Sequence, residues 1–114
     1  MIMYNASNIT QKESQYVANM HTQRNNDLLL VSNNFKNKSS QTVCFTYKFK
    51  CIRVSASGKS ANSQSGSFVA ASGQAIALSK TSLSIRPSDS YSLLLEIYSE
   101  NQLMASHSLT VPQL

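Results

Sequence analysis

The sequence predicts an all-β domain, an immunoglobulin-like antiparallel β-sandwich of about seven strands. Apolar residues recur at every second position, as in strands that bury one face, and turn-forming residues separate the apolar runs at short intervals. With 114 residues, 41% of them hydrophobic, the chain has room for one core. We therefore expect a single sandwich domain over residues 13–114. Nothing in residues 1–12 requires order, so we treat them as an N-terminal segment that can be flexible.

The clearest strand is predicted from Thr42 to Val54. Its core-facing set comprises Val43, Phe45, Tyr47, Phe49 and Cys51, and the opposite set comprises Cys44, Thr46, Lys48 and Lys50. Successive residues of a strand point to opposite faces, so the two lysines share the exposed face. The alternation slips near Arg53, and a β-bulge there would bring Arg53 to the same face as the lysines.

The other strands are shorter and are separated by polar segments. Before Thr42 we predict strands over residues 15–23 and 28–31, a turn at 24–27 and a polar connection at 33–40. After Val54 we predict a Ser/Gly-rich loop at 55–66, strands at 67–71, 75–78 and 82–85, and a hairpin of 91–98 with 103–111. No run of about 18 apolar residues occurs, so we expect no membrane insertion.

The charge is concentrated in the middle of the chain. The sequence has 10 Lys+Arg and 5 Asp+Glu, for a net charge of +5, and no acidic residue lies between Asp27 and Asp89. This segment holds eight basic residues, namely Lys36, Lys38, Lys48, Lys50, Arg53, Lys59, Lys80 and Arg86. They are interpreted either as solvated charges that deter edge-to-edge aggregation or as a surface that attracts an acidic or polar partner. We expect no nucleic-acid binding, because no exposed aromatic residues alternate with the basic ones.

The two cysteines are the candidate redox residues. On a straight strand Cys44 and Cys51 would lie about 23 Å apart on opposite faces, which predicts a surface thiol and a buried thiol rather than a disulfide. The enzymatic alternative is a thiol-disulfide oxidoreductase-like sandwich that uses Cys44, its thiolate favoured by Lys48. His21 and His107 lie in no metal-ligand spacing, and no nucleophile elbow or phosphate loop occurs. We expect no catalytic residues, no metal and no cofactor.

Several short motifs occur in a characteristic order. They are Gln64-Ser65-Gly66-Ser67-Phe68, Gln74-Ala75-Ile76-Ala77-Leu78-Ser79-Lys80 and Ser82-Leu83-Ser84-Ile85-Arg86-Pro87-Ser88-Asp89. In this order they resemble the CsgC/CsgH family of bacterial curli assembly proteins, and the first motif is closer to the CsgH branch. The similarity runs from about residue 42 to about residue 109.

The resemblance implies a small periplasmic sandwich, expected to be monomeric, that transiently contacts a curlin-type amyloid subunit and prevents its premature polymerisation. In the family this contact is attributed to a basic surface, and the matching positions here are Lys48, Lys50, Arg53 and Lys59. The CsgC branch has a Cys-x-Cys pair that this chain lacks, which weakens the redox alternative. A structural or adhesive subunit that forms stable oligomers is a third possibility. The first residues lack the basic and apolar parts of a secretory signal, so no export signal is visible.

Overall fold

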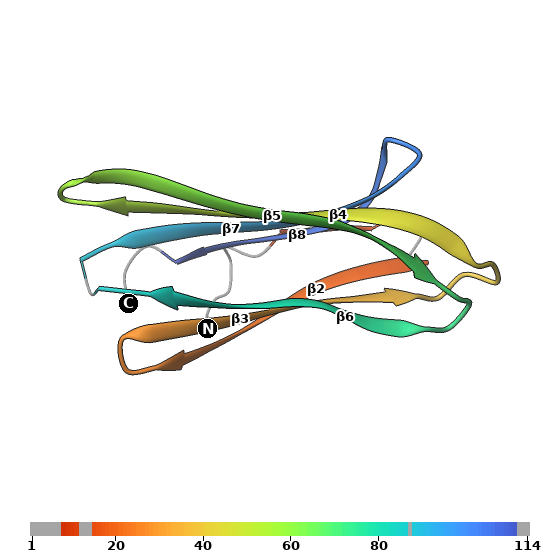
Figure 1. Cartoon of the computed structure of the whole chain (residues 1–114), viewed down its shortest axis with the longest axis horizontal. Coiled ribbons are helices and arrows are strands. Elements are labelled where there is room, and N and C mark those ends of the chain that lie inside the picture. Colours follow the sequence, from red (N-terminus) through yellow and green to blue (C-terminus); the bar gives the residue numbers. More distant parts are fainter. Residues whose placement is uncertain (1–7, 12–14, 87, 112–114) are drawn as a thin grey trace.

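A computed structural model describes residues 8–11, 15–86 and 88–111 of the chain. In these residues eight strands form two antiparallel sheets that pack face to face (Figure 1), which confirms the predicted β-sandwich. The strands are β1 (Asn8–Gln11), β2 (Tyr16–Asn25), β3 (Leu28–Asn37), β4 (Val43–Ser55), β5 (Gly58–Ala70), β6 (Ala75–Ser84), β7 (Ser90–Ser99) and β8 (Gln102–Val111).

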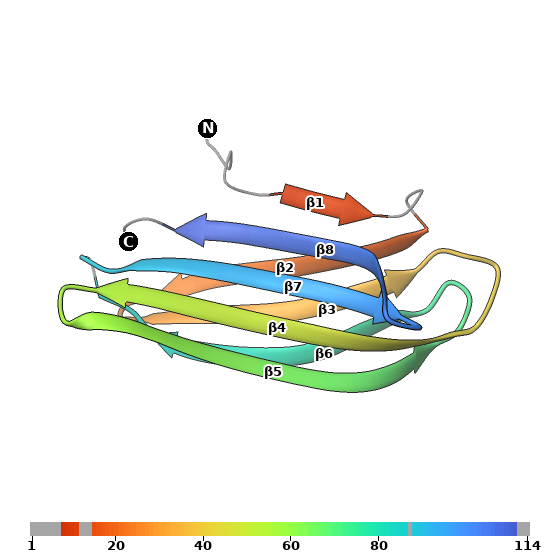
Figure 2. The same ribbon diagram turned by 90° about the horizontal axis from the view of Figure 1, so that it is seen from above.

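The larger sheet has the strand order β1-β8-β7-β4-β5, and the smaller sheet has the order β2-β3-β6 (Figure 2). Consecutive strands change sheet after β1, after β3, after β5 and after β6, as in the Greek-key connections of immunoglobulin-like sandwiches. Of the N-terminal segment 1–12, residues 8–11 form β1, which pairs with β8. Residues 1–7 and 12 lie outside the described residues.

Aromatic rings from both sheets fill one end of the core. The ring centroids of Phe35 and Phe45 lie 4.7 Å apart, those of Phe45 and Phe68 lie 5.3 Å apart, and Tyr16 meets Phe45 edge-on at 5.5 Å. Along the length of the core the inward residues of β7 are almost completely buried, and these are Tyr91, Leu93, Leu95 and Ile97. The period-two alternation identified the core-facing positions of β4 correctly, since Phe45, Phe49 and Cys51 are buried.

Strand β3 is longer than predicted. Residues 33–37, expected in a polar connection, continue the strand because they pair with β2 on one side and, up to Lys36, with β6 on the other. The polar side chains of Asn33 and Asn37 are fully buried. The Asn37 side-chain amide donates hydrogen bonds to the carbonyls of Gln41 and Ala70, and its Oδ1 accepts one from the Ser39 amide at 2.9 Å. Asn37 thus holds the crossing from β3 to β4 against the end of β5.

Two further predictions for residues 55–85 were wrong. The expected loop at residues 55–66 is a tight turn followed by most of β5, and the two short strands predicted within residues 75–85 are the single strand β6. Ser, Asn and Gly have low strand propensity, but every residue of β5 is opposite a residue of β4 in an uninterrupted register. Pairing with a long neighbour outweighs local propensity here.

Candidate functional site

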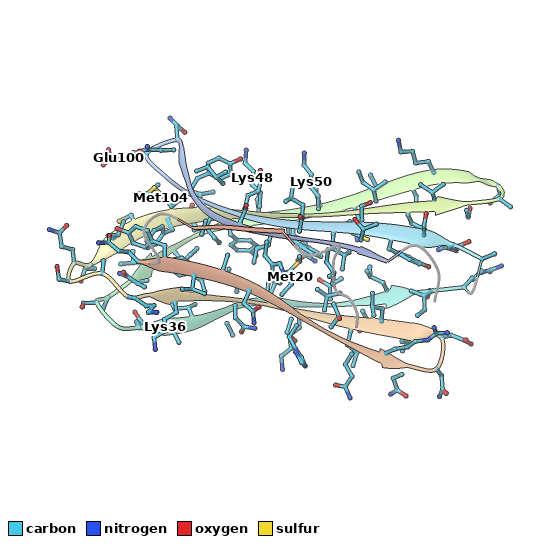
Figure 3. All side chains as sticks on the ribbon, turned by 180° about the vertical axis from the view of Figure 1, so that it is seen from behind. Met20, Lys36, Lys48, Lys50, Glu100 and Met104 are labelled. Carbon is cyan, nitrogen blue, oxygen red and sulfur yellow. The ribbon has the colours of Figure 1, made fainter. Side chains whose placement is uncertain are left out.

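The outward face of β4 carries two exposed lysines. Lys48 and Lys50 alternate with the buried Phe49 and Cys51, so both ammonium groups project from the outer side of the five-stranded sheet. Figure 3 shows the two side chains on this side of the sandwich, with Lys36 on the opposite side. This placement agrees with the alternation read from the sequence.

Arg53 does not join these lysines. The register of β4 with β5 and with β7 continues through Arg53 without a shift, so the expected bulge is absent and Arg53 keeps the parity of the core-facing residues. Its Nε donates to Oδ2 of Asp89 at 2.7 Å, and the Asp89 side chain is only 2% exposed. Asp89, the first acidic residue after Asp27, therefore neutralises Arg53, one of the eight basic residues between them. This pairing corrects the expected orientation of Arg53.

On β5, Lys59 faces the same side as Lys48 and Lys50, since it is opposite the outward-facing Val54. Three consecutive outward positions of β5 after Ala61 are occupied by small hydroxyl residues. Ser63 is opposite Lys50, Ser65 is opposite Lys48, and Ser67 is opposite Thr46. We call this outward surface of β4 and β5 the basic face, defined by Lys48, Lys50, Lys59, Ser63, Ser65 and Ser67.

The neighbouring strand β7 places different groups beside the two lysines. Lys48 is opposite Glu96, and its Nζ lies 5.2 Å from the ring centroid of Tyr98. Burial raises the pKa of Tyr98, and the negative charge of Glu96 and a hydrogen bond with it raise this pKa further. Lys50, by contrast, is opposite Ser63 and Leu94, neither of which carries a charge. Of the two lysines of β4, Lys50 is therefore the one whose charge the neighbouring strands compensate less.

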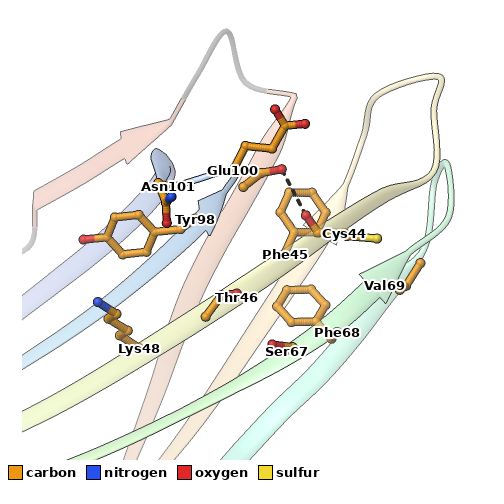
Figure 4. Close-up of a pocket in the computed structure, with 11 residues that line it drawn as sticks. Cys44, Phe45, Thr46, Lys48, Ser67, Phe68, Val69, Tyr98, Glu100 and Asn101 are labelled. Atoms are coloured by element: carbon orange, nitrogen blue, oxygen red, sulfur yellow. Dashed lines mark hydrogen bonds between the residues drawn. The ribbon is translucent and has the colours of Figure 1, made fainter.

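A groove of about 600 Å³ lies at one end of the basic face, beneath the tip of the β7–β8 hairpin (Figure 4). Figure 1 shows this tip rising away from the sheet, and the register shifts between Ile97 and Tyr98. Glu100 and Asn101 adopt φ values of 53° and 64°, as in the tight turns preferred by hairpins. The groove is lined by Cys44, Phe45, Thr46, Lys48, Ser67, Phe68, Val69, Tyr98, Ser99, Glu100 and Asn101.

A hydrogen bond ties the hairpin tip to β4. Ser99 Oγ donates to the Cys44 carbonyl at 3.0 Å, shown as the dashed line in Figure 4. The sequence predicted the hairpin, but it did not identify Tyr98, Ser99, Glu100 and Asn101 as residues beside the basic face. Their positions depend on the register shift, for which the sequence carries no distinct signal.

The two thiols have the environments that the sequence predicted. Cys44 is exposed and lines the groove, whereas Cys51 is buried, and both are free. Burial raises the pKa of Cys51, against a weaker lowering by the charge of Arg53. Seven positions on one uninterrupted strand separate the thiols by about 23 Å and send them to opposite faces. They cannot form a disulfide with each other in this fold.

Within residues 8–11, 15–86 and 88–111, no group of three or more His, Cys, Asp or Glu side chains could hold a metal ion. The same residues include no helix of the length and apolar character needed to cross a membrane.

No protein-family model and no curated protein sequence matches this chain. Among solved structures, the E. coli curli protein CsgC superposes with a TM-score of 0.65 at 22% identity, covering 85% of this chain and 98% of CsgC. This chain has a CsgC/CsgH-like fold. R. palustris CsgH superposes with a TM-score of 0.58 at 14% identity, covering 80% of this chain and 89% of CsgH. This likeness of fold agrees with the resemblance read from the sequence motifs, and it extends over most of the chain.

Proposed function

We propose that the protein is a non-enzymatic, periplasmic, monomeric inhibitor of amyloid assembly that acts on a curlin-type subunit. The observation that carries this proposal is the basic face, where Lys48, Lys50 and Lys59 project from one side of a fold shared with a curli protein. Arg53 is left out of the proposed contact because Asp89 already binds its guanidinium group.

Charge and side-chain size explain how such a surface could act. Amyloid grows when extended segments add to open strand edges, so a protein that occupies these segments slows growth. A cationic surface attracts polar or acidic unfolded segments over long range and increases the rate of encounter. The short serine side chains around Lys48 and Lys50 leave the ammonium groups accessible to such a segment. A weak, reversible contact suffices, because amyloid nuclei are rare.

The direct test is the polymerisation of purified curlin, followed by thioflavin-T fluorescence, with substoichiometric amounts of the protein. We expect a longer lag phase, and an unchanged lag phase would contradict the proposal. The double variant Lys48→Glu, Lys50→Glu should lose most of the delay while its circular dichroism spectrum stays native.

The chain offers a matched control for this double variant. Lys36→Glu with Lys80→Glu changes the net charge by the same amount, but both residues lie on the outward face of the three-stranded sheet. This control should retain the delay. Equal loss of delay in both double variants would mean that net charge acts, and not the basic face.

The exposed thiol of Cys44 in the groove favours one other candidate, a thiol-disulfide oxidoreductase-like domain. Cys51 lies on the opposite face of β4, so a mixed disulfide at Cys44 would need an external thiol for its resolution. Cys44→Ser separates the two functions. It should abolish any disulfide exchange and leave the delay of curlin polymerisation unchanged.

A further inference from the structure

Strand β5 forms a long edge of the five-stranded sheet. It pairs with β4 over 13 residues without a register shift, and its outward-facing residues from Lys59 to Ser67 are exposed. Proteins usually protect such edges with proline, charged side chains, bulges or short strands. Between Ser60 and Ala70 the sequence of β5 contains no proline and no charged residue.

The other sheet edges in the described part of the chain are better protected. Strand β1 has only four residues, and in β2 the amide of Met20 is already bonded to His107 of β8. Strand β6 carries the charged Lys80, and its pairing with β3 is interrupted by a register shift at Asn33 and Asn34. An extended segment would therefore meet the longest unprotected row of backbone groups at β5.

The hydrogen-bond pattern identifies which groups of β5 are free. The Cys44 carbonyl accepts from Ser99, so the backbone groups of Cys44 point toward β7. Successive residues of a strand direct their N–H and C=O groups to opposite sides, so residues two apart direct them to the same side. The backbone groups of Thr46, Lys48 and Lys50 therefore also point toward β7. Their partners on β5 accordingly direct their backbone N–H and C=O groups to the open edge, and these partners are Ser67, Ser65 and Ser63.

The side chains beside this edge favour an acidic occupant. A strand added to β5 would lie about 10 Å from β4, and only the small hydroxyl groups of Ser63 and Ser65 would stand between it and the two lysines. Lysine has a flexible four-carbon stem, so Lys48 and Lys50 can lean across β5 to meet carboxylates on the added strand. A second copy of this chain would instead place two basic faces side by side, which its net charge of +5 opposes.

We propose that the β5 edge binds an extended polypeptide segment with acidic side chains at alternate positions, as a sixth strand of the large sheet. The segment forms main-chain hydrogen bonds with Ser63, Ser65 and Ser67, and its carboxylates meet Lys48 and Lys50. Main-chain bonds give affinity in this mode of recognition, and the alternate side chains give specificity. The inference rests on the proposed function, since it states how a curlin-type segment would be held.

The test uses a capped synthetic peptide of 12 residues in which glutamate and threonine alternate. At saturating peptide, NMR-detected hydrogen exchange of the Ser63, Ser65 and Ser67 amides should slow at least tenfold. A peptide of alternating lysine and threonine should cause no such protection. Unchanged exchange at all three amides with bound acidic peptide would overturn the proposal. Protection of these amides that rises with protein concentration in the absence of peptide would also overturn the proposal, because it would identify a second copy of the chain as the occupant.

A proline substitution tests the main-chain bonds directly. Ser65→Pro removes an amide hydrogen that points away from β4, so the pairing with β4 loses no hydrogen bond. We expect at least tenfold weaker peptide binding for Ser65→Pro and a change within twofold for Ser65→Thr, which keeps the amide. Equal binding of both variants would refute the proposal. If circular dichroism shows that Ser65→Pro is unfolded, the proposal is tested by the hydrogen exchange of the Ser63, Ser65 and Ser67 amides in the unmodified protein.

The curlin assay separates this inference from the proposed function. If the protein delays polymerisation and folded Ser65→Pro delays it equally, the function stands and the edge contact is refuted. If the acidic peptide protects the β5 amides but curlin polymerises at its normal rate, the edge contact stands and the proposed function fails.

Discussion

The backbone amide of Met20 in β2 donates a hydrogen bond of 2.9 Å to Nδ1 of His107 in β8. The two residues belong to different sheets, and both are buried, so this bond joins the sheets inside the sandwich. The accepting nitrogen must be unprotonated, and burial lowers the pKa of His107 below its usual range.

We predict that His107 makes the protein less stable in mild acid. In the unfolded chain the imidazole takes up a proton near its usual pKa of about 6.5, whereas the folded protein resists protonation until a lower pH. The free energy of unfolding should therefore fall as the pH drops below about 6.5, until the lowered pKa of the folded state is passed.

Thermal unfolding measured across this pH range checks the prediction. His107→Asn places a non-titrating acceptor near the position of Nδ1, so its melting temperature should fall less between pH 7 and about pH 5 than that of the unmodified protein. The exposed His21 is common to both proteins and cancels in the comparison. An equal fall in melting temperature for His107→Asn and the unmodified protein would show that His107 does not cause the acid sensitivity.

Removal of the Arg53 guanidinium should be costly for stability. Arg53→Met leaves the carboxylate of Asp89 buried without its partner, for which we expect a loss of about 3 kcal/mol in the free energy of unfolding. Lys59→Met, on the exposed face, should change it by no more than about 0.5 kcal/mol. Urea unfolding measures both values, and a loss as small for Arg53→Met as for Lys59→Met would contradict the structural assignment.

The two thiols should differ in reactivity. A thiol reagent such as DTNB should modify Cys44 at once in the folded protein and Cys51 only upon unfolding, because Cys51 is buried and its pKa is raised. Cys51→Ser should lower the free energy of unfolding by about 1–3 kcal/mol, since it places a hydroxyl in the core. Rapid modification of both thiols under native conditions would contradict the burial of Cys51.

Asn37 should be a major determinant of stability. Asn37→Ala leaves the carbonyls of Gln41 and Ala70 and the amide of Ser39 without their partner, so we expect a loss of about 3 kcal/mol. Asn19→Ala, at an exposed position of β2, should change the free energy of unfolding by about 0.5 kcal/mol or less. Similar melting temperatures for the two variants would argue against this hydrogen-bond network.

The sequence predicted those strands whose apolar residues alternate with polar ones. In β4 the alternation gave both the strand and its buried face, and in β7 it gave the strand, because one face of each packs on the core. The first part of β5 could not be predicted, because residues such as Ser60 and Asn62 have local preferences that favour turns. The structure assigns them to a strand because β4 extends beside them, and this pairing between segments leaves no local pattern.

The same limit applies to the candidate site. The positions of Lys48 and Lys50 followed from alternation within one strand and could be predicted. The pairing of Arg53 with Asp89 joins residues 36 positions apart, and no spacing rule signals it. The hairpin groove depends on one register shift near Tyr98, which moves four residues next to β4 without a sequence motif.

The short turn of the β4–β5 hairpin, between Ser55 and Gly58, affects the order in which the parts of the protein fold. Its first pair closes a loop of two residues, whereas the pairing of β1 with β8 joins Asn8 to Ser108 across most of the chain. Loop-closure entropy rises with the length of chain enclosed, and contacts between near neighbours form fastest. We expect this hairpin to nucleate folding, so that the surface carrying Lys48, Lys50 and Lys59 assembles before the two ends of the chain come together.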